Sequence, residues 1–219
     1  MTKLQIYGSS PFLPTQSQKG SRLERLALSV TICLVFLFCA AAAITSSAQS
    51  LTTLASFDGA DGAFPVAPVI QGTDGNFYGT TPNGGANEDG MVFKITPSGR
   101  LTTLYSFCTV PEWCPDGANP SAALVEGTDG NFYGTTTHGG GGICCDTDGT
   151  IFKITPGGDL TTLHNFPSFP DDGYLPSSAL VQAGDGNFYG TTEIGGAHGD
   201  GTVFRLVTLR PCIVCPSLE

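Results

Sequence analysis

The sequence has few charged residues, and basic residues are the scarcest of them. Only 13% of the 219 residues are charged, with nine Lys or Arg against nineteen Asp or Glu. Four of the nine basic residues and one of the nineteen acidic residues precede Ala48, which leaves a net charge of −13 on the rest of the chain. Such a surface repels nucleic acid and anionic lipid, keeps a Gly-rich chain soluble and attracts cations. No nucleic-acid partner is therefore expected.

The sequence also lacks the short motifs by which several enzyme classes are recognised. It contains no Gly-x-Ser-x-Gly, no His-Glu-x-x-His and no phosphate-binding Gly-rich loop. We therefore predict no catalytic residue. Carboxylate pairs for glycoside hydrolysis are defined by their distance in space, which the sequence does not show. A carbohydrate-active lyase or hydrolase that uses acidic residues in its loops is accordingly an open alternative.

Helical periodicity is absent after Ala48, whereas the N-terminal part contains one long apolar run. Residues 26–44 hold no charged side chain, and a helix of this length can cross a bilayer. Basic residues precede the run and Ser46-Ser47-Ala48 follows it, the order typical of a secretory signal. We predict that residues 1–48 form one hydrophobic helix, either a cleaved signal peptide or an uncleaved anchor. The rest of the chain is then secreted, periplasmic or at the cell surface, and only an uncleaved anchor holds it to a membrane.

The most informative feature is the octapeptide Asp-Gly-Asn-Phe-Tyr-Gly-Thr-Thr, which occurs three times unchanged, starting at Asp74, Asp129 and Asp185. Leu-Thr-Thr-Leu precedes each copy, and a block of Val/Ile-Phe-Lys/Arg-Ile/Leu follows it. A repeat of this length indicates one supersecondary unit that is copied and stacked. The blocks define a repeat domain over residues 49–208, with units of about 51–100, 101–159 and 160–208. A Cys-containing tail, residues 209–219, follows.

Each unit has the pattern of four β-strands. In the second unit the expected strands are Leu101–Phe107, Ser121–Glu126, Asn131–Thr136 and Thr150–Thr155. Asp129-Gly130 between two such strands predicts a two-residue type I′ hairpin turn. Gly134 would weaken its strand unless something approaches it closely, and in stacked sheets we expect the neighbouring sheet to do so.

Four antiparallel strands per unit of about 50 residues are typical of a β-propeller blade. The fold predicted is therefore all-β, with three tandem four-stranded antiparallel repeats. Three blades are fewer than the usual four to eight. The chain is accordingly a partial ring that self-association completes, an open stack of sheets, or a fragment of a longer array. A first Leu-Thr-Thr-Leu strand at Leu51–Phe57, whose partners lie at the far end, is typical of ring closure by an exchanged strand.

Cysteine use agrees with export, because six of the eight cysteines follow Ala48. Cys108 and Cys114 flank an insertion, Thr-Val-Pro-Glu-Trp, that the other two units lack. We predict a disulfide between them that braces this loop. The pairing of the other four stays open: Cys144, Cys145, Cys212 and Cys215.

Several residues are candidates for ligand binding. Tyr78, Tyr133 and Tyr189 occupy one position of the repeat, where they either line a sugar- or peptide-binding face or pack between sheets. His138 and His198 lie in equivalent Gly-rich loops that follow the octapeptide. The sequences of these loops vary, so the loops either bind a ligand on a constant scaffold or are merely connections that tolerate change.

One acidic segment resembles the start of a calcium loop. Asp146 and Asp148 are followed by a glycine, but position 157, where the full pattern has Glu, is Gly157. We retain Ca²⁺ as a candidate ligand of this segment. No other cofactor is predicted.

The stretches ALVEGTDGNFYGTT, GTIFKITPGG and LTTLHNF resemble the Gloeobacter–Verrucomicrobium (GloVer) repeat of exported bacterial proteins. The resemblance covers nearly all of residues 51–206. It implies an extracytoplasmic, propeller-like repeat protein and supplies no established activity. Members are often tethered by a C-terminal sorting tail, but this chain ends in RPCIVCPSLE without an apolar tail, so such tethering is not expected.

Together these features predict an exported, non-enzymatic repeat scaffold that binds a glycan or protein ligand at the surface or in the periplasm. The alternatives are the carbohydrate-active enzyme described above and a truncated piece of a longer repeat protein. A truncated piece would expose unpaired sheet edges and aggregate.

Overall fold

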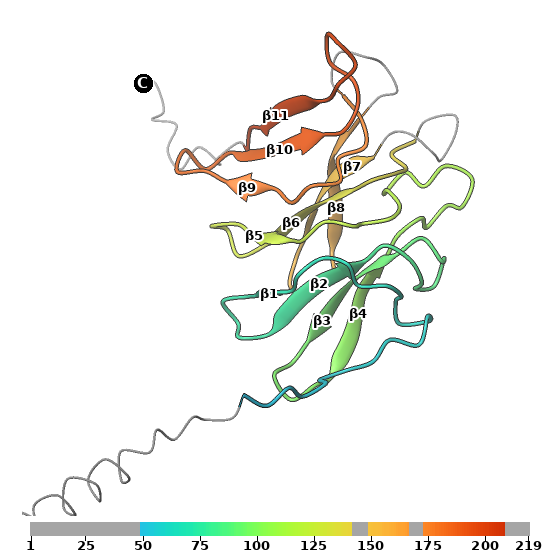
Figure 1. The fold of residues 1–219 in the computed structure, drawn as a ribbon, viewed down its shortest axis with the longest axis vertical. Coiled ribbons are helices and arrows are strands. Elements are labelled where there is room, and N and C mark those ends of the chain that lie inside the picture. Colours follow the sequence, from blue (N-terminus) through green and yellow to red (C-terminus); the bar gives the residue numbers. More distant parts are fainter. Residues whose placement is uncertain (1–48, 142–148, 167–172, 209–219) are drawn as a thin grey trace, which may run out of the picture. The chain divides into compact units, whose positions relative to one another are not determined.

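The computed structural model describes residues 49–141, 149–166 and 173–208 (Figure 1). The predicted N-terminal hydrophobic helix, the predicted calcium segment and the tail lie outside these residues. The described residues contain strands, turns and bends, and no helix that could span a membrane.

Three antiparallel sheets make up the described fold, as the repeats predict. The first has the order β1 (Ile70–Gln71), β2 (Phe77–Thr81), β3 (Met91–Ile95), β4 (Leu101–Ser106). The second has the order β5 (Val125–Glu126), β6 (Phe132–Thr136), β7 (Thr150–Ile154), β8 (Leu160–Asn165). The third contains only β9 (Val181–Gln182), β10 (Phe188–Thr192) and β11 (Thr202–Leu206).

The Leu-Thr-Thr-Leu stretches supply the last strand of a sheet, and not the first. β4 and β8 pair with the strands that precede them, so the first and second sheets take their fourth strand from the start of the next sequence unit. The strand expected at Leu51–Phe57 is not formed, because none of the described strands lies beside it to pair with. β11 likewise has no partner on its outer side among the described residues.

The octapeptide turns differ from the predicted type I′ geometry. In the first copy Gly75 N donates to Gly72 O at 2.9 Å, and Gly72 N donates to Asn76 O at 2.8 Å. Gly75 has a φ of 81°, whereas Asp74 is not among the non-Gly residues with positive φ. A type I′ turn requires positive φ at both central positions, so the loop is instead a three-residue hairpin that ends in a left-handed glycine.

The glycine inside each octapeptide strand is approached closely, but by its own sheet. A Cβ on Gly134 would lie 2.6 Å from the Phe152 ring on β7 and 2.9 Å from Leu124. Gly79 and Gly190 meet the equivalent Phe rings of their own sheets at 2.5 and 2.4 Å. The prediction that the neighbouring sheet demands this glycine is therefore wrong. The cross-strand Phe ring fills the space that a side chain would take.

Successive sheets pack through the same pairs of rings. Tyr78 on the first sheet stacks on Phe132 of the second with centroids 3.9 Å apart, and Tyr133 on the second stacks on Phe188 of the third at 4.0 Å. Within the described residues the sheets form an open series and not a closed ring (Figure 1). The observed fold is thus a propeller-like series of sheets.

Candidate functional site

Each octapeptide builds the same polar network around its aspartate. Asp129 accepts hydrogen bonds from the Asn131 amide at 2.7 Å, the Asn131 backbone N–H at 3.2 Å and the Tyr133 hydroxyl at 2.9 Å. The networks at Asp74 and Asp185 have the same donors. Burial alone would raise the pKa of the Asp129 carboxyl, but the hydrogen bonds from Asn131 and Tyr133 lower it below its ordinary value. This geometry explains why Asp, Asn and Tyr are invariant among the three copies.

The three tyrosines predicted to bind ligand occupy different environments. Tyr78 and Tyr133 are buried, each against the Phe ring of the following sheet. Burial and the nearby Asp129 carboxylate raise the pKa of Tyr133 to about 12. Tyr189 is half-buried, because no described sheet follows the third. The three side chains therefore lie at separate positions along the series and do not form one site.

A cavity of about 560 Å³ lies between the second and third sheets, beside one of these tyrosines. Its polar lining includes Thr128, Asp129, Lys153 and Gln182, and its apolar lining includes Leu163 and Leu206. Ligand pockets in proteins usually measure about 300–1,000 Å³ and combine apolar walls with a few polar groups. The cavity therefore has the size and lining of a small-molecule site.

The cavity exists because this sheet pair departs from the repeat. Between the first and second sheets, Lys94 Nζ reaches Asp74 at 3.1 Å and lies 5.4 Å from the centre of the Tyr78 ring. The turn after β7 also closes on this region, since a Cβ on Gly158 would lie 2.7 Å from the Leu104 carbonyl oxygen.

The corresponding groups between the second and third sheets leave the space open. Lys153 forms no ion pair within the described part of the chain, although it is the counterpart of Lys94. After β11 the chain continues through Val207 to Thr208, whose hydroxyl donates to Gly186 O at 3.0 Å, in place of the Thr-Pro-Gly-Gly turn.

The polar groups of the cavity are held in fixed positions. Gln182 accepts a hydrogen bond from Thr128 N–H at 3.0 Å and donates to Gly186 O at 3.1 Å. Asp129 is fixed by its own network. The cavity thus offers a pre-positioned carboxylate and amide together with a lysine that forms no ion pair with any other described residue.

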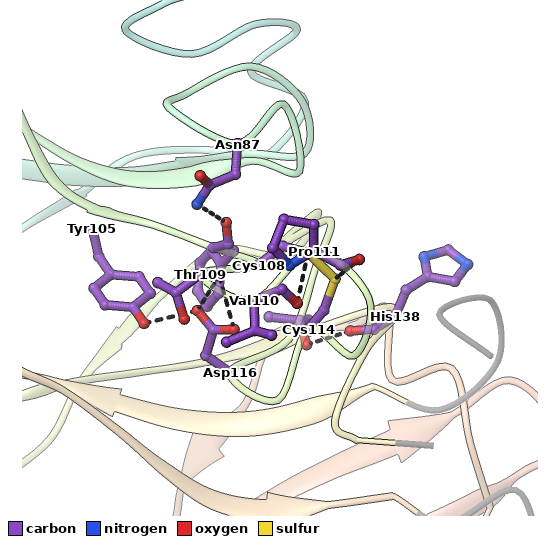
Figure 2. Close-up of a disulfide and its surroundings, with 11 residues drawn as sticks. Asn87, Tyr105, Cys108, Thr109, Val110, Pro111, Cys114, Asp116 and His138 are labelled. Atoms are coloured by element: carbon purple, nitrogen blue, oxygen red, sulfur yellow. Dashed lines mark hydrogen bonds between the residues drawn. A yellow bond between two sulfur atoms is a disulfide. The ribbon is translucent and has the colours of Figure 1, made fainter. Parts of the chain in front are cut away.

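A second structured feature is the insertion loop on the second unit, which the predicted Cys108–Cys114 disulfide closes (Figure 2). Asp116 at its base is buried and accepts hydrogen bonds from the Tyr105 hydroxyl at 2.7 Å and from Thr109 N–H at 3.3 Å. Burial and the Asp116 contact raise the pKa of Tyr105 to about 12. The loop is therefore anchored at both ends.

The rim of this loop exposes apolar side chains. Trp113, the only tryptophan of the chain, is 53% exposed and Val110 is 43% exposed. Asp89 lies near both cysteine sulfurs, but these sulfurs are bonded to each other and do not offer thiolate ligands to a metal.

The remaining predicted residues lie apart from the cavity. The His138 ring points away from the Tyr105–Asp116 pair (Figure 2), and its Nδ1 is buried without a hydrogen-bond partner among the described residues. His198 is exposed in the loop between β10 and β11. Asp146 and Asp148 fall outside the described residues, so the calcium prediction remains a prediction.

The sequence reasoning did not identify Lys153, Leu163 or Gln182. Their repeat positions look ordinary, since Lys94 and Leu104 occupy the same positions in the first sheet. The one signal was the absence, after Leu206, of a turn equivalent to Thr155–Gly158, which closes on Leu104 between the first and second sheets.

Comparison with known proteins places the chain among repeat proteins. None of the curated proteins matches the sequence significantly. A crystal structure described as that of a gluconolactonase has 13% identity and a TM-score of 0.40, covering 63% of this chain and 48% of that one. The chain thus spans about half of that protein, and this likeness is too weak to inform activity. The Gloeobacter/Verrucomicrobia repeat matches residues 40–210, a stretch that includes all three sheets, and the chain therefore belongs to the Gloeobacter/Verrucomicrobia repeat family.

Proposed function

We propose that this protein is an exported, non-enzymatic repeat scaffold that binds a glycan in the cavity between its second and third sheets. The observation that carries the proposal is the cavity itself. At the equivalent place between the first and second sheets, Lys94 is paired with Asp74 and the turn at Gly158 closes on the Leu104 carbonyl oxygen. A departure from a repeated scaffold is where a specific site is expected.

The lining suits a hydroxylated ligand. Asp129 and Gln182 supply a carboxylate and an amide to hydroxyl groups, and the Lys153 ammonium supplies a charged donor. Leu163 and Leu206 offer apolar walls to the C–H faces of a sugar ring. A glycan presents both hydroxyl groups and C–H faces, and the cavity offers a partner to each.

The electrostatics favour binding over acid catalysis. A glycosidase acid must hold its proton near neutral pH, which requires a raised pKa. The hydrogen bonds from Asn131 and Tyr133 instead keep the pKa of Asp129 below its ordinary value, so this carboxylate is ionised and acts as an acceptor.

Export is supported by two independent features. The N-terminal segment has the order of a secretory signal, with basic residues before an apolar run. The Cys108–Cys114 disulfide is compatible with an oxidising compartment outside the cytoplasm.

A glycan array followed by calorimetric titration of the best binder tests the proposal. Lys153→Met should weaken binding about tenfold or more, because a hydrogen bond to a charged group contributes about 1.5–3 kcal/mol and 1.4 kcal/mol is tenfold in Kd. The matched control is Lys94→Met, which removes the equivalent lysine between the first and second sheets, outside the lining of the cavity, and should leave Kd unchanged. Leu163→Trp should fill the cavity and abolish binding, at a side chain that is already 36% exposed.

Two results would reject this function. The cavity is not the site if no glycan binds, or if Lys94→Met and Lys153→Met weaken binding equally. Release of new reducing or unsaturated sugar ends from the bound glycan would show an enzyme and not a binding scaffold.

A further inference from the structure

The two outer faces of the series of sheets carry the same kinds of residues as the two faces that meet wherever one sheet packs on the next. Among the described residues, neither outer face is covered by another sheet. On the third sheet, Val203 is 79% exposed, whereas its counterparts Val92 and Ile151 on the other two sheets are 0% and 1% exposed. Tyr189 is half-buried, whereas Tyr78 and Tyr133 are buried. The outer face of the third sheet, defined by Tyr189, Thr191 and Val203, thus presents residues that the following sheet covers at every internal position.

The first sheet shows the opposite half. A groove of about 280 Å³ on its open face is lined by residues that include Leu54, Val69, Phe77, Phe93 and Ile95. Val69 is 49% exposed, whereas its counterparts Leu124 and Leu180 are each 3% exposed beneath the preceding sheet.

The internal interface shows what fits this groove. At the second sheet the corresponding residues are Leu124, Phe132, Phe152 and Ile154, which form one buried cluster, and Leu104 of β4 on the first sheet, which packs against it. Tyr78 and Val92 of the preceding sheet complete that cluster. The residues that would fill the groove of the first sheet in the same way are therefore Tyr189 and Val203.

The segment before the first sheet packs against that sheet in the same way that β4, the fourth strand of the first sheet, packs against the second. Phe57 packs edge-on against Phe93 with centroids 5.1 Å apart and planes at 68°. Phe107, which follows β4, packs against Phe152 of the second sheet at 5.1 Å and 62°. Leu54, Ala55 and Phe57 thus lie against the first sheet as Leu104, Tyr105 and Phe107 lie against the second.

Among the described residues, β11 lacks such a partner on its outer side. In the complete sheets Val92 lies opposite Tyr105 and Ile151 lies opposite His164. Continuation of this register places Val203 of β11 opposite Ala55, and Thr202 opposite Ser56.

Polar contacts at the turns extend the same pattern. Thr73 N–H donates to Glu126 of the following sheet at 3.0 Å, and Thr128 N–H donates to Gln182 at 3.0 Å. Gly184 occupies the position of the donors Thr73 and Thr128 in the third unit, and Gln71 occupies the position of the acceptors Glu126 and Gln182 in the first. The Gly184 N–H and the Gln71 side-chain oxygen therefore lie one on each open face.

We propose that a second copy of this chain docks head to tail on the first, so that residues 51–56 of one copy become the fourth strand beside β11 of the other. Tyr189 then stacks on Phe77, and Val203 enters the groove beside Val69. Two copies joined by two identical contacts form a closed ring of six sheets, which lies within the four to eight sheets usual for propellers. This inference does not depend on the ligand of the cavity.

Cysteine crosslinking between differently tagged full-length chains, purified in mild detergent, tests the contact. Mixing a Val203→Cys chain with an Ala55→Cys chain should give a disulfide-linked heterodimer, because these positions face each other in the proposed ladder. Val203→Cys mixed with Val66→Cys is the control for random collision, and chains without added cysteine control for the native thiols.

Light scattering of the same chain tests the stoichiometry. The unaltered protein should have twice the mass of one chain, and Val203→Lys should reduce it to one chain. Val110→Lys places the same charge on the insertion loop, away from both faces, and should leave the mass doubled. Since Val203 is exposed in a single chain, its replacement should not unfold the sheets.

Each other outcome overturns the proposal. A chain that carries both Val203→Cys and Ala55→Cys distinguishes contact within one chain. A crosslink that forms in this chain only, with monomeric mass, would show that the segment folds back on its own β11. Absence of the heterodimer with a monomeric mass would show that β11 is covered by another part of the chain or left open. A mass well above two chains would reject the closed ring.

Discussion

The contact between Gly134 and Phe152 makes a quantitative prediction about stability. A Cβ at position 134 would lie 2.6 Å from the Phe152 ring and 2.9 Å from Leu124, and both of these side chains are buried. Overpacking of a well-filled core costs about 1–3 kcal/mol. The lower conformational entropy of the unfolded alanine chain offsets about 0.4–1 kcal/mol of that cost.

We expect Gly134→Ala to destabilise the protein by about 1–2 kcal/mol, measured by urea unfolding followed by circular dichroism. This corresponds to a decrease in Tm of about 2–8 °C for a domain of this size. Gly157→Ala is the matched control, because its Cβ would meet nothing closer than 3.6 Å and its φ is not in the left-handed region.

A double-mutant cycle identifies the ring as the cause. Phe152→Leu alone should be destabilising, because it leaves a void above Gly134. In the double variant the alanine methyl group enters that void, so the combined loss should be smaller than the sum of the two single losses. Equal stability of Gly134→Ala and Gly157→Ala, or full additivity in the cycle, would refute the reasoning that the Phe ring excludes a side chain here.

Further predictions concern pH and the insertion loop. The raised pKa values of Tyr105 and Tyr133, both about 12, favour their neutral forms in the folded state, so their contribution to stability should be complete below about pH 10, the unfolded pKa. It should disappear between about pH 10 and 12, and Tyr133→Phe should reduce this loss in alkaline unfolding experiments. The lowered pKa of Asp129 has the opposite consequence: its contribution to the stability of the folded state is present above about pH 4 and is lost in acid. Asp129→Asn should lack this acid-dependent loss. Replacement of both Cys108 and Cys114 by Ser should cost at most about 2–3 kcal/mol, because the closed loop is short, and amide exchange should increase mainly within the loop; global unfolding at room temperature would contradict this.

The sequence was sufficient to predict most of the strands and their antiparallel pairing, because alternation and turn residues are local signals. It did not predict that each Leu-Thr-Thr-Leu strand joins the sheet of the preceding unit. The identical octapeptides carry the Asp, Asn and Tyr network within a single hairpin, so their repetition indicated repeated structure correctly. The disulfide between Cys108 and Cys114 was also predictable, since it closes an insertion that only one unit contains.

Features that depend on neighbouring sheets were not predictable in this way. Leu51–Phe57 has the same strand pattern as β4 and β8, but a strand requires a partner, and the segment has none among the strands that the structure describes. The approach to Gly134 comes from a cross-strand ring on β7, which sequence spacing does not reveal. Lys153 lines a cavity whereas Lys94 forms an ion pair, because the chain after β11 takes a different path.

The central claim is that residues 51–56 complete the third sheet, and amide hydrogen exchange tests it most directly. The exchange of residues 51–56 should be slow in the unaltered protein and fast in Val203→Lys, although the replaced residue lies in the sheet at the other end of the same chain. The control is β6, whose exchange should be the same in both proteins. Fast exchange of residues 51–56 in the unaltered protein, or slow exchange that Val203→Lys does not change, would contradict the account.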